Sequence, residues 1–484
     1  MQDQQGQGLF KNRITTELLQ TIGKKEVKLF SKFIAFKGSK GSIDFWKILS
    51  GYHPKYDVKD ADVFRKLHPN KPYSDGLLRV RSSELNTYIK EFLVYQEYQK
   101  DPLHLANTLA RTLFHRRANK WYQKQKKLND KLISDNKQLT TKTYYHLHEK
   151  EIIDYQFITI TNPRQTTASL QQASAYNDDS YLVEKLRYLI LLRNRERIVK
   201  DNHKDETEDS FLTYLANFHI DNKPIIKVYY LLLLVFKNLT SNHEFQQFKQ
   251  YFLENRTLFE TNEARQIFTF ATNICFWNIQ LGHLDFLNHR FELNKIMVEE
   301  NYLTVLGHFS SNHFSSIVVG AIEANQLTWA SSFLEEYLPK TKPEDRNNLE
   351  ALHRAALLFA QGEYTKQADY MFQIEQLEGY RAKDTYDAIF YRTLELKTAY
   401  KLLGNKPKQR SLESAQGKIN SYQAYINRKN SIPSSVKKSR LNFAKALRLI
   451  FLTHHGKKKL SVDLKQEILS LQPITELPWL LNEI

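Results

Sequence analysis

A break in helical patterning recurs five times between residues 220 and 430, and this recurrence constrains the fold more than any other feature. In FAQGEYTKQADYMF, apolar residues spaced as on an α-helix stop before Gly362 and resume at Tyr364. Glycine and asparagine tolerate the left-handed backbone conformation that ends a helix, so each break predicts the corner of an antiparallel helical hairpin. The breaks are centred on Asn242, Gly282, Asn325, Gly362 and Gly404, which lie 40, 43, 37 and 42 residues apart.

A pair of helices that repeats about every 40 residues is typical of an α-solenoid. The chain has only 15 Gly and 12 Pro among 484 residues, and this scarcity of turn formers also favours an all-α fold. One hairpin cannot bury its own apolar face, so neighbouring hairpins must pack together. We therefore expect the following side chains to be buried between hairpins: Trp329, Phe333, Leu357, Tyr364, Ala368 and Phe372.

The turn sequences resemble those of divergent tetratricopeptide repeats. In that family a turn of glycine, an acidic residue and an aromatic residue is followed by a small alanine and then by another aromatic residue. This spacing is followed by Asn325, Leu327, Ala330 and Leu334. The turn alone is matched by Gly362, Glu363 and Tyr364, with Ala368 one residue late. The resemblance covers roughly residues 220–430 and implies stacked hairpins; an array of helical hairpins without this kinship is the alternative.

The rest of the chain divides by composition into three further segments. Residues 1–98 read as a small N-terminal helical domain, for which a winged-helix-like module is the alternative. Residues 99–220 read as long basic helices leading into the array at 221–430, and residues 431–484 as a basic C-terminal helical cap. The run VKDNHKDETEDS, from Val199 to Ser210, is dense in charge and lacks apolar periodicity, which indicates an exposed linker.

The net charge of +17 is unevenly distributed. Residues 102–129 and 426–459 contain lysine and arginine but no carboxylate, whereas residues 241–400 carry an acidic excess. Basic clusters beside aromatic rings can bind phosphates and stack on bases. If one helix spans the first cluster, its spacings of four, four and three residues place four basic side chains on a single face: Arg116, Lys120, Lys124 and Lys127. The candidate nucleic-acid contacts are Arg116, Arg117, Lys120, Trp121, Lys124 and Lys127. The alternatives are a solvated helix face, an acidic protein partner or a membrane surface.

Motifs that carry enzyme chemistry are missing from the sequence. It has no phosphate-binding glycine loop, no HExxH and no GxSxG. In YYHLHEKE, His146 and His148 point to different sides of a helix and cannot share a metal, whereas His148 and Glu151 could. We therefore expect no catalytic residue, no cofactor and no metal site. The single cysteine, Cys275, lies in an apolar run and is expected to be a buried, inert thiol.

These observations favour a non-enzymatic scaffold or adaptor that binds a protein or peptide along a helical-repeat superhelix. The alternative is a nucleic-acid-binding factor that uses the basic helices at 102–129 and 426–459. No segment has the length and apolarity of a membrane span, the N-terminus lacks the apolar core of a secretory signal, and we expect a cytoplasmic protein. The partner, the process and the oligomeric state are left open by the sequence.

Overall fold

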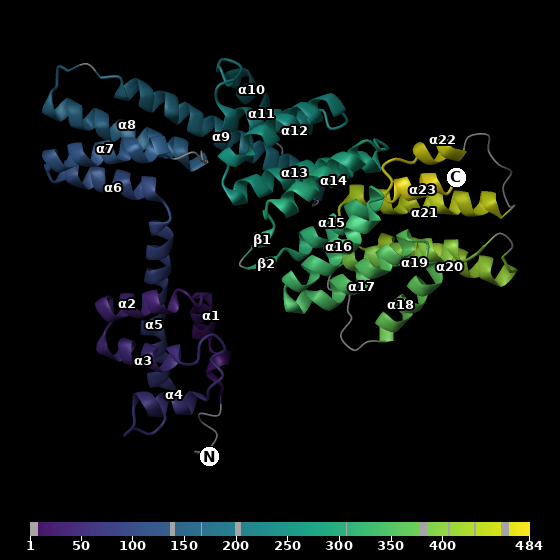
Figure 1. The fold of residues 1–484 in the computed structure, drawn as a ribbon, viewed down its shortest axis with the longest axis horizontal. Helices are drawn as coiled ribbons and strands as arrows, with labels where there is room; N and C mark the ends of the chain where they lie inside the picture. The colour runs from purple at the N-terminus through teal and green to yellow at the C-terminus, as the bar shows by residue number, and fades with distance from the viewer. Residues whose placement is uncertain are drawn as a thin grey trace. The chain divides into compact units, whose positions relative to one another are not determined.

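The computed structural model describes residues 8–135, 141–165, 167–198, 205–305, 307–376, 385–404, 407–429, 432–455 and 464–484. The chain forms two compact units (Figure 1). The first comprises residues 1–136 and 149–170, and the second comprises residues 137–148 and 171–484. Among the described residues almost all regular structure is helical, so the protein belongs to the all-α class.

The first unit begins with four short helices, of which the first three pack on one long helix and the fourth packs on the third. These helices are α1 (Ile14–Thr21), α2 (Val27–Lys37), α3 (Lys40–Ser50), α4 (Asp60–Leu67) and the long α5 (Asp75–Gln99). Their core is aromatic: the ring of Phe30 lies 4.8 Å from that of Trp46 and 5.2 Å from that of Phe92. No strand occurs among residues 8–98, so this described part of the unit lacks the wing of a winged-helix module.

Three further helices follow, namely α6 (Pro102–His115), α7 (Asn119–Asp135) and α8 (Thr141–Thr161). Proline at the first position of α6 and Asp101 as its N-cap explain why the helix begins there, because the Asp101 carboxylate accepts a hydrogen bond from the His104 amide at 2.9 Å. Residues 149–161 of α8 belong to the first unit and pack on α6 and α7 through Tyr122, Ile153 and Phe157.

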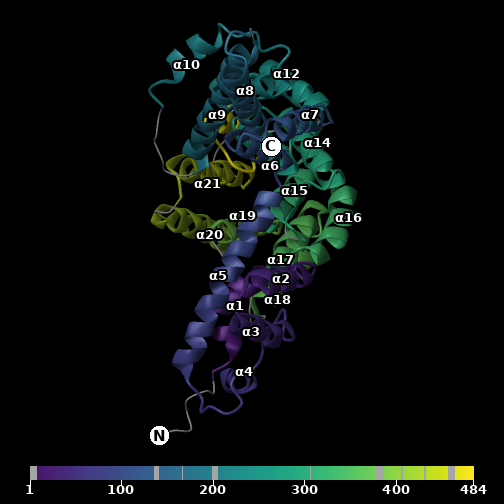
Figure 2. The same cartoon turned by 90° about the vertical axis from the view of Figure 1, so that its left-hand side faces the viewer.

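The second unit is a succession of helices joined by short connections. They are α9 (Ser169–Ile198), α10 (Glu208–Leu215), α11 (Pro224–Lys237), α12 (Asn242–Asn255), α13 (Thr261–Gln280), α14 (Phe286–Glu299), α15 (Ser311–Glu323), α16 (Leu327–Tyr337), α17 (Pro343–Ala360), α18 (Tyr364–Gln376), α19 (Thr385–Lys401), α20 (Gln409–Arg428), α21 (Ser434–His454), α22 (Leu464–Leu469) and α23 (Leu477–Asn482). A two-stranded antiparallel sheet, β1 (Thr304–Val305) with β2 (His308–Phe309), lies between α14 and α15. Most consecutive helices pack against one another, and α19, α20 and α21 lie side by side in Figures 1 and 2.

The predicted corners are confirmed where the backbone is left-handed. Gly282, Asn325, Gly362 and Gly404 have φ angles of 91°, 57°, 81° and 64° and follow α13, α15, α17 and α19. After α17 the amide of Glu363 donates to the carbonyl of Leu358 at 2.9 Å, and that of Gly362 donates to Phe359 at 3.0 Å. This pair of bonds is the Schellman motif, which satisfies the last carbonyls of a helix.

The prediction for Asn242 as a corner residue is wrong. It is the first residue of α12, and the chain reverses just before it, between Lys237 and Ser241. The hydroxyl oxygen of Ser241 accepts a hydrogen bond from the amide of Glu244 at 3.3 Å. This corner is therefore closed by a serine N-cap instead of a left-handed residue.

Burial between the hairpins follows the prediction only in part. Phe333 and Leu357 are buried, whereas Trp329, Tyr364 and Ala368 are half-buried. Phe372 is 65% exposed, so the prediction for it is wrong. The buried face of α18 instead contains Gln367 and Met371, one helical turn apart. The prediction starts the helical period at the wrong residue of the turn, and this shift places Phe372 on the buried face of α18.

Of the predicted linker at residues 199–210, the structure describes only residues 205–210. Residues 199–204 lie outside the described residues. Asp205 accepts a hydrogen bond from the Lys185 ammonium at 2.5 Å, and Glu208 is a buried residue that begins α10. The second half of the stretch is therefore tied to the fold, because Asp205 and Glu208 are ion-paired and α10 buries Phe211.

The C-terminal helices return to the middle of the second unit. The amide of Ile474 donates to the carbonyl of Gln280 in α13 at 2.9 Å, and the Ser439 hydroxyl of α21 donates to the Gln280 side chain at 2.8 Å. α23 packs on α13 and on α21. This return brings residues 476–482 beside segments that lie roughly 80 to 200 residues earlier in the chain, and it closes the pocket described below.

Candidate functional site

The basic segment at residues 102–129 lies on two helices. Arg116 caps α6 and Arg117 has a φ angle of 58°, so the first helix ends there. The prediction that Arg116 shares one helical face with Lys120, Lys124 and Lys127 is therefore wrong, because a left-handed residue separates them. The three lysines themselves remain on one face of α7 at spacings of four and three residues.

The candidate nucleic-acid contacts of this segment are all exposed, but the neighbouring Tyr122 is not. Trp121 is 63% exposed, and the Lys124 ammonium lies 4.6 Å from its ring centroid. Tyr122, however, is buried: its hydroxyl donates to Asp154 at 2.5 Å, and its ring stacks on Phe157 at 4.1 Å. Tyr122 therefore cannot line a basic groove. In the part of the chain that the structure describes, no carboxylate pairs with any of Arg116, Arg117, Lys120, Lys124 and Lys127.

The second basic segment, residues 426–459, covers the end of α20 and all of α21, and residues 430–431 and 456–459 of it lie outside the described residues. Several of its basic groups serve the fold. The Lys437 ammonium donates to the carbonyl of Asn427 at 2.9 Å, and the Arg448 guanidinium donates to the Gln423 side chain at 2.9 Å. Arg440 acts electrostatically on two buried carboxylates, Glu323 and Glu476.

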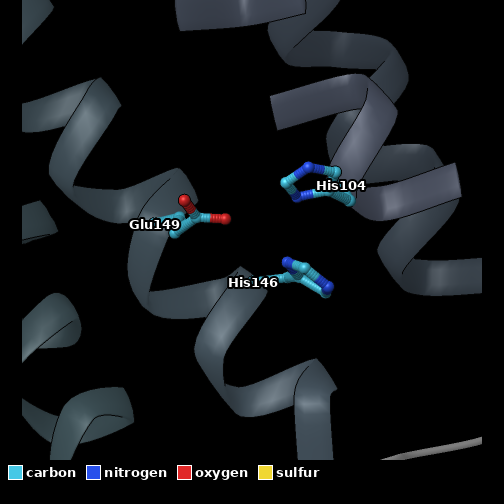
Figure 3. A group of neighbouring side chains, drawn as sticks. All are labelled: His104, His146 and Glu149. Atoms are coloured by element: carbon cyan, nitrogen blue, oxygen red, sulfur yellow. The ribbon is translucent and has the colours of Figure 1, made fainter. Parts of the chain in front are cut away.

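Figure 3 shows a group of metal-type side chains. His104 lies on α6, and His146 and Glu149 stand one turn apart on α8; the potential ligand atoms of the group lie within 4.8 Å. Two imidazoles and one carboxylate form a donor set that zinc accepts. The Glu149 carboxylate, however, already accepts a hydrogen bond from the Arg111 guanidinium at 2.7 Å. A guanidinium at this distance opposes a divalent cation, and we assign no ion to the group.

Sequence reasoning places two members of this group in one motif but misses His104, about 40 residues away. The sequence also predicts that His148 and Glu151 share a helix face and could bind a metal together. The Nδ1 atom of His148 is instead hydrogen-bonded to the carbonyl oxygen of Ala173 at 3.0 Å, and Glu151 accepts from Lys150 at 2.8 Å. Both side chains therefore serve the packing of α8.

A pocket of about 350 Å³ lies within the second unit and is the strongest candidate for a binding site. Its walls come from α15, α16, α17, α19 and α23, so segments distant in sequence form it together. The lining is mainly apolar and aromatic, and includes Ile322, Leu327, Ala356, Phe359, Ala360, Phe390, Leu394, Pro478 and Trp479. It also includes two exposed asparagines, Asn325 and Asn482, so the pocket opens to solvent.

Charged side chains in and behind the wall are paired with one another. The Lys397 ammonium lies 2.7 Å from the Glu476 carboxylate, and the Arg290 guanidinium lies 2.6 Å from that of Glu323. Lys397 also lies over two aromatic rings, 4.7 Å from the centroid of Phe359 and 5.1 Å from that of Trp479. The pocket therefore offers an apolar body bordered by neutralised charge pairs, with no uncompensated charge that would select an ionic ligand.

The pKa values of the two carboxylates are shifted in opposite directions. Burial raises the pKa of Glu323 more than the Arg290 charge lowers it, so this pKa lies above its ordinary value. Burial also raises the pKa of Glu476, but the charge and hydrogen bond of Lys397 outweigh it, and this pKa lies below its ordinary value. The Lys397–Glu476 pair is thus the more firmly ionised of the two.

The backbone at Glu476 is strained. Its φ of 58° and ψ of 24° are left-handed, a conformation that costs a non-glycine residue about 1–2 kcal/mol. Its ion pair with Lys397 and the packing of α23 hold it in place. Nothing in the local sequence around Glu476 or Lys397 marks a site, because the two residues lie far apart along the chain and meet only through the return of α23.

Comparisons with known proteins add no assignment. No family model, no curated protein and no solved structure matches the chain. No helix of the described residues is long and apolar enough to span a membrane. The all-α class and the pocket of the second unit are therefore the features on which a functional argument rests.

Proposed function

We propose that this chain is a non-enzymatic protein-interaction scaffold in which stacked, tetratricopeptide-like helical hairpins form an α-solenoid, and that the pocket of the second unit holds an apolar side chain of a partner protein. The observation that carries the proposal is the pocket bordered by Phe359, Phe390 and Trp479. Aromatic walls of this kind receive the aromatic or aliphatic anchors that dominate binding energy at protein interfaces.

The dimensions of the pocket agree with such an occupant. Its volume of about 350 Å³ lies at the lower end of the range for ligand pockets, which is roughly 300–1,000 Å³. That space accommodates one large side chain together with a short stretch of its backbone. Burying one such side chain contributes about 1.5–3 kcal/mol, enough to make one position of a bound peptide decisive.

The polar groups of the pocket favour a peptide over a charged metabolite. Lys397 is compensated by Glu476, and Glu323 by Arg290, so a ligand's charge would have to break a pair to be recognised. The lining contains no histidine, cysteine or serine, and its two carboxylates, Glu323 and Glu476, are held in ion pairs instead of standing free as general bases. The two exposed asparagines, Asn325 and Asn482, supply amide donors and acceptors for the backbone of a peptide.

We also propose that the protein is cytoplasmic. Cys275 is fully buried, and burial raises the pKa of its thiol, so the only cysteine of the chain is unreactive and needs no oxidising compartment.

A peptide-display selection on the full chain tests the proposal. Binding peptides are expected to share one aromatic or long aliphatic position. They should bind a pocket-filling variant, Ala360→Trp, at least about tenfold more weakly, because the indole occupies the space of the anchor. Ala360 is half-buried at the end of α17 and lines the pocket.

The matched control carries the same substitution one residue further on. Gln361 is exposed and does not line the pocket, so Gln361→Trp should bind like the parent. Recovery of no anchored peptide, or equal binding by the Ala360→Trp variant, would refute the proposal.

A further inference from the structure

Helix α7 of the first unit exposes an apolar stripe that no described residue of its own unit covers. Trp121, Leu128 and Leu132 are 63%, 55% and 39% exposed. At about 100° per residue, these three side chains fall within about 40° of one another around the helix axis. Gln125 completes a spacing of four, three and four residues along this line, which is the seam of a coiled coil. We call these four residues the α7 seam.

A row of lysines follows the α7 seam on one side. Lys120, Lys124, Lys127 and Lys131 are all exposed, and all lie roughly 60–120° from the seam in the same direction. In the described residues none of them pairs with a carboxylate, although Lys126 on the inner face pairs with Asp154 at 2.9 Å. The inner ion pairs therefore belong to the fold, whereas the outer lysines have no such role.

The opposite side of the α7 seam faces the interior of the unit. Tyr122 and Asn129 are buried there, and Asn129 donates a hydrogen bond to the Asn107 side chain of α6 at 3.3 Å. Only one flank is therefore free for a partner. Lys124 and Lys131 occupy the positions directly beside the seam from which coiled-coil helices make their interhelical ion pairs.

We propose that the α7 seam and its lysine row bind an acidic amphipathic helix of a partner protein. Leucines of that helix pack on Trp121, Leu128 and Leu132, and its glutamates pair with Lys124 and Lys131. This surface is distinct from the pocket of the second unit, so the inference does not depend on the pocket. The seam spans a helix of 17 residues, so the contact is small and its affinity should be micromolar.

The shape of the surface favours a protein helix over two other anionic partners. Trp121 could stack on a base, but Leu128 and Leu132 on the same line offer no ring for stacking. A helix lying in a membrane interface has a broad apolar face with lysines on its polar face. The α7 seam is narrow and its lysines stand on one side only. A narrow seam with one charged flank is the pattern of helix pairing.

The test uses the full chain and a labelled synthetic peptide of about three heptads, with leucine at its seam positions and glutamate beside them. Fluorescence anisotropy should give a micromolar Kd for the parent. Lys124→Glu combined with Lys131→Glu should weaken binding at least about tenfold and should strengthen binding of the same peptide made with lysine for glutamate. Leu128→Ser combined with Leu132→Ser should weaken binding of both peptides.

Matched reversals on another exposed helix face, Lys28→Glu and Lys32→Glu of α2, should leave binding unchanged, and circular dichroism checks that each variant keeps its helix content. Labelled oligothymidine and phosphatidylserine vesicles are titrated in parallel. The inference is overturned if either of these binds more tightly than the peptide, if a scrambled peptide of equal charge binds as well, or if the serine variants bind like the parent.

Discussion

Truncating Phe333 should remove much of the stability of the second unit, although the substitution touches no proposed binding surface. Phe333 is 3% exposed, and its ring stacks between those of Trp329 and Tyr337 at 5.3 Å and 4.8 Å. The ring of Phe314 approaches it to 5.2 Å. Phe333→Ala leaves a cavity among these rings, and such a change costs about 3–5 kcal/mol, including about 0.5–1.5 kcal/mol for each aromatic pair lost.

Urea unfolding followed by circular dichroism measures this loss. With a slope of about 3 kcal/mol per molar urea, the transition of the second unit should move to lower urea by about 1 M or more. Phe372→Ala is the control, because the sequence pattern of the hairpin gives both phenylalanines the same role, whereas the structure leaves Phe372 65% exposed. Its cost should stay within about 0.5 kcal/mol. Equal shifts for the two variants would refute the packing described for α16 and α18.

Three further changes test other parts of the structure. Gly362→Ala should cost about 1–2 kcal/mol in the same assay, because the φ angle of Gly362 is 81°. The control, Gly417→Ala at an exposed position within α20, should instead stabilise the unit by about 0.5–1 kcal/mol. Equal effects of the two substitutions would contradict the left-handed corner. Burial lowers the pKa of His353 to about 4. As the pH falls from 6.5 to 4.5, the unfolded chain therefore protonates this imidazole before the folded chain does, and the free energy of unfolding should drop by about 2 kcal/mol. His353→Phe should reduce that drop. Lys397→Met leaves the Glu476 carboxylate buried without its partner and should cost about 3 kcal/mol of stability. Most of this loss should be recovered in the double variant that also carries Glu476→Gln. A double variant as unstable as Lys397→Met would contradict the ion pair.

The corners of the second unit could be predicted because a left-handed residue leaves a local trace. Gly282, Asn325, Gly362 and Gly404 each stand between two apolar patterns, where glycine or asparagine strongly indicates the left-handed end of a helix. Before α12, Asn242 suggests the same device, but Ser241 caps the following helix instead. A serine cap is harder to distinguish from an ordinary polar loop, so the sequence does not locate this corner.

The end of the first basic helix could not be predicted for a similar reason. Arg117 adopts a left-handed conformation without being glycine or asparagine, so no residue type indicates the end of α6. The inward turn of Tyr122 depends on Asp154, a residue of α8. A helical period read along one segment cannot include a partner that lies on another helix.

The pocket could not be predicted at all. Phe359, Lys397, Glu476 and Trp479 come from α17, α19 and the start of α23, and α23 reaches the others only because Ile474 is hydrogen-bonded to Gln280. The sequence of the last 20 residues carries apolar patterning but nothing that specifies where it docks. Packing between segments that are distant in the chain determines the site, and such packing cannot be derived from a single sequence.

The most direct test of the interaction scaffold is a calorimetric titration of the full chain with the tightest peptide from the display selection. Replacing the anchor residue of the peptide by alanine should weaken binding by about 2 kcal/mol, or roughly 30-fold. The Ala360→Trp variant should lose a similar amount of binding free energy, and the Gln361→Trp variant should lose none. Unchanged affinity after removal of the anchor, or equal losses in the two tryptophan variants, would contradict the claim that the pocket holds a partner's side chain.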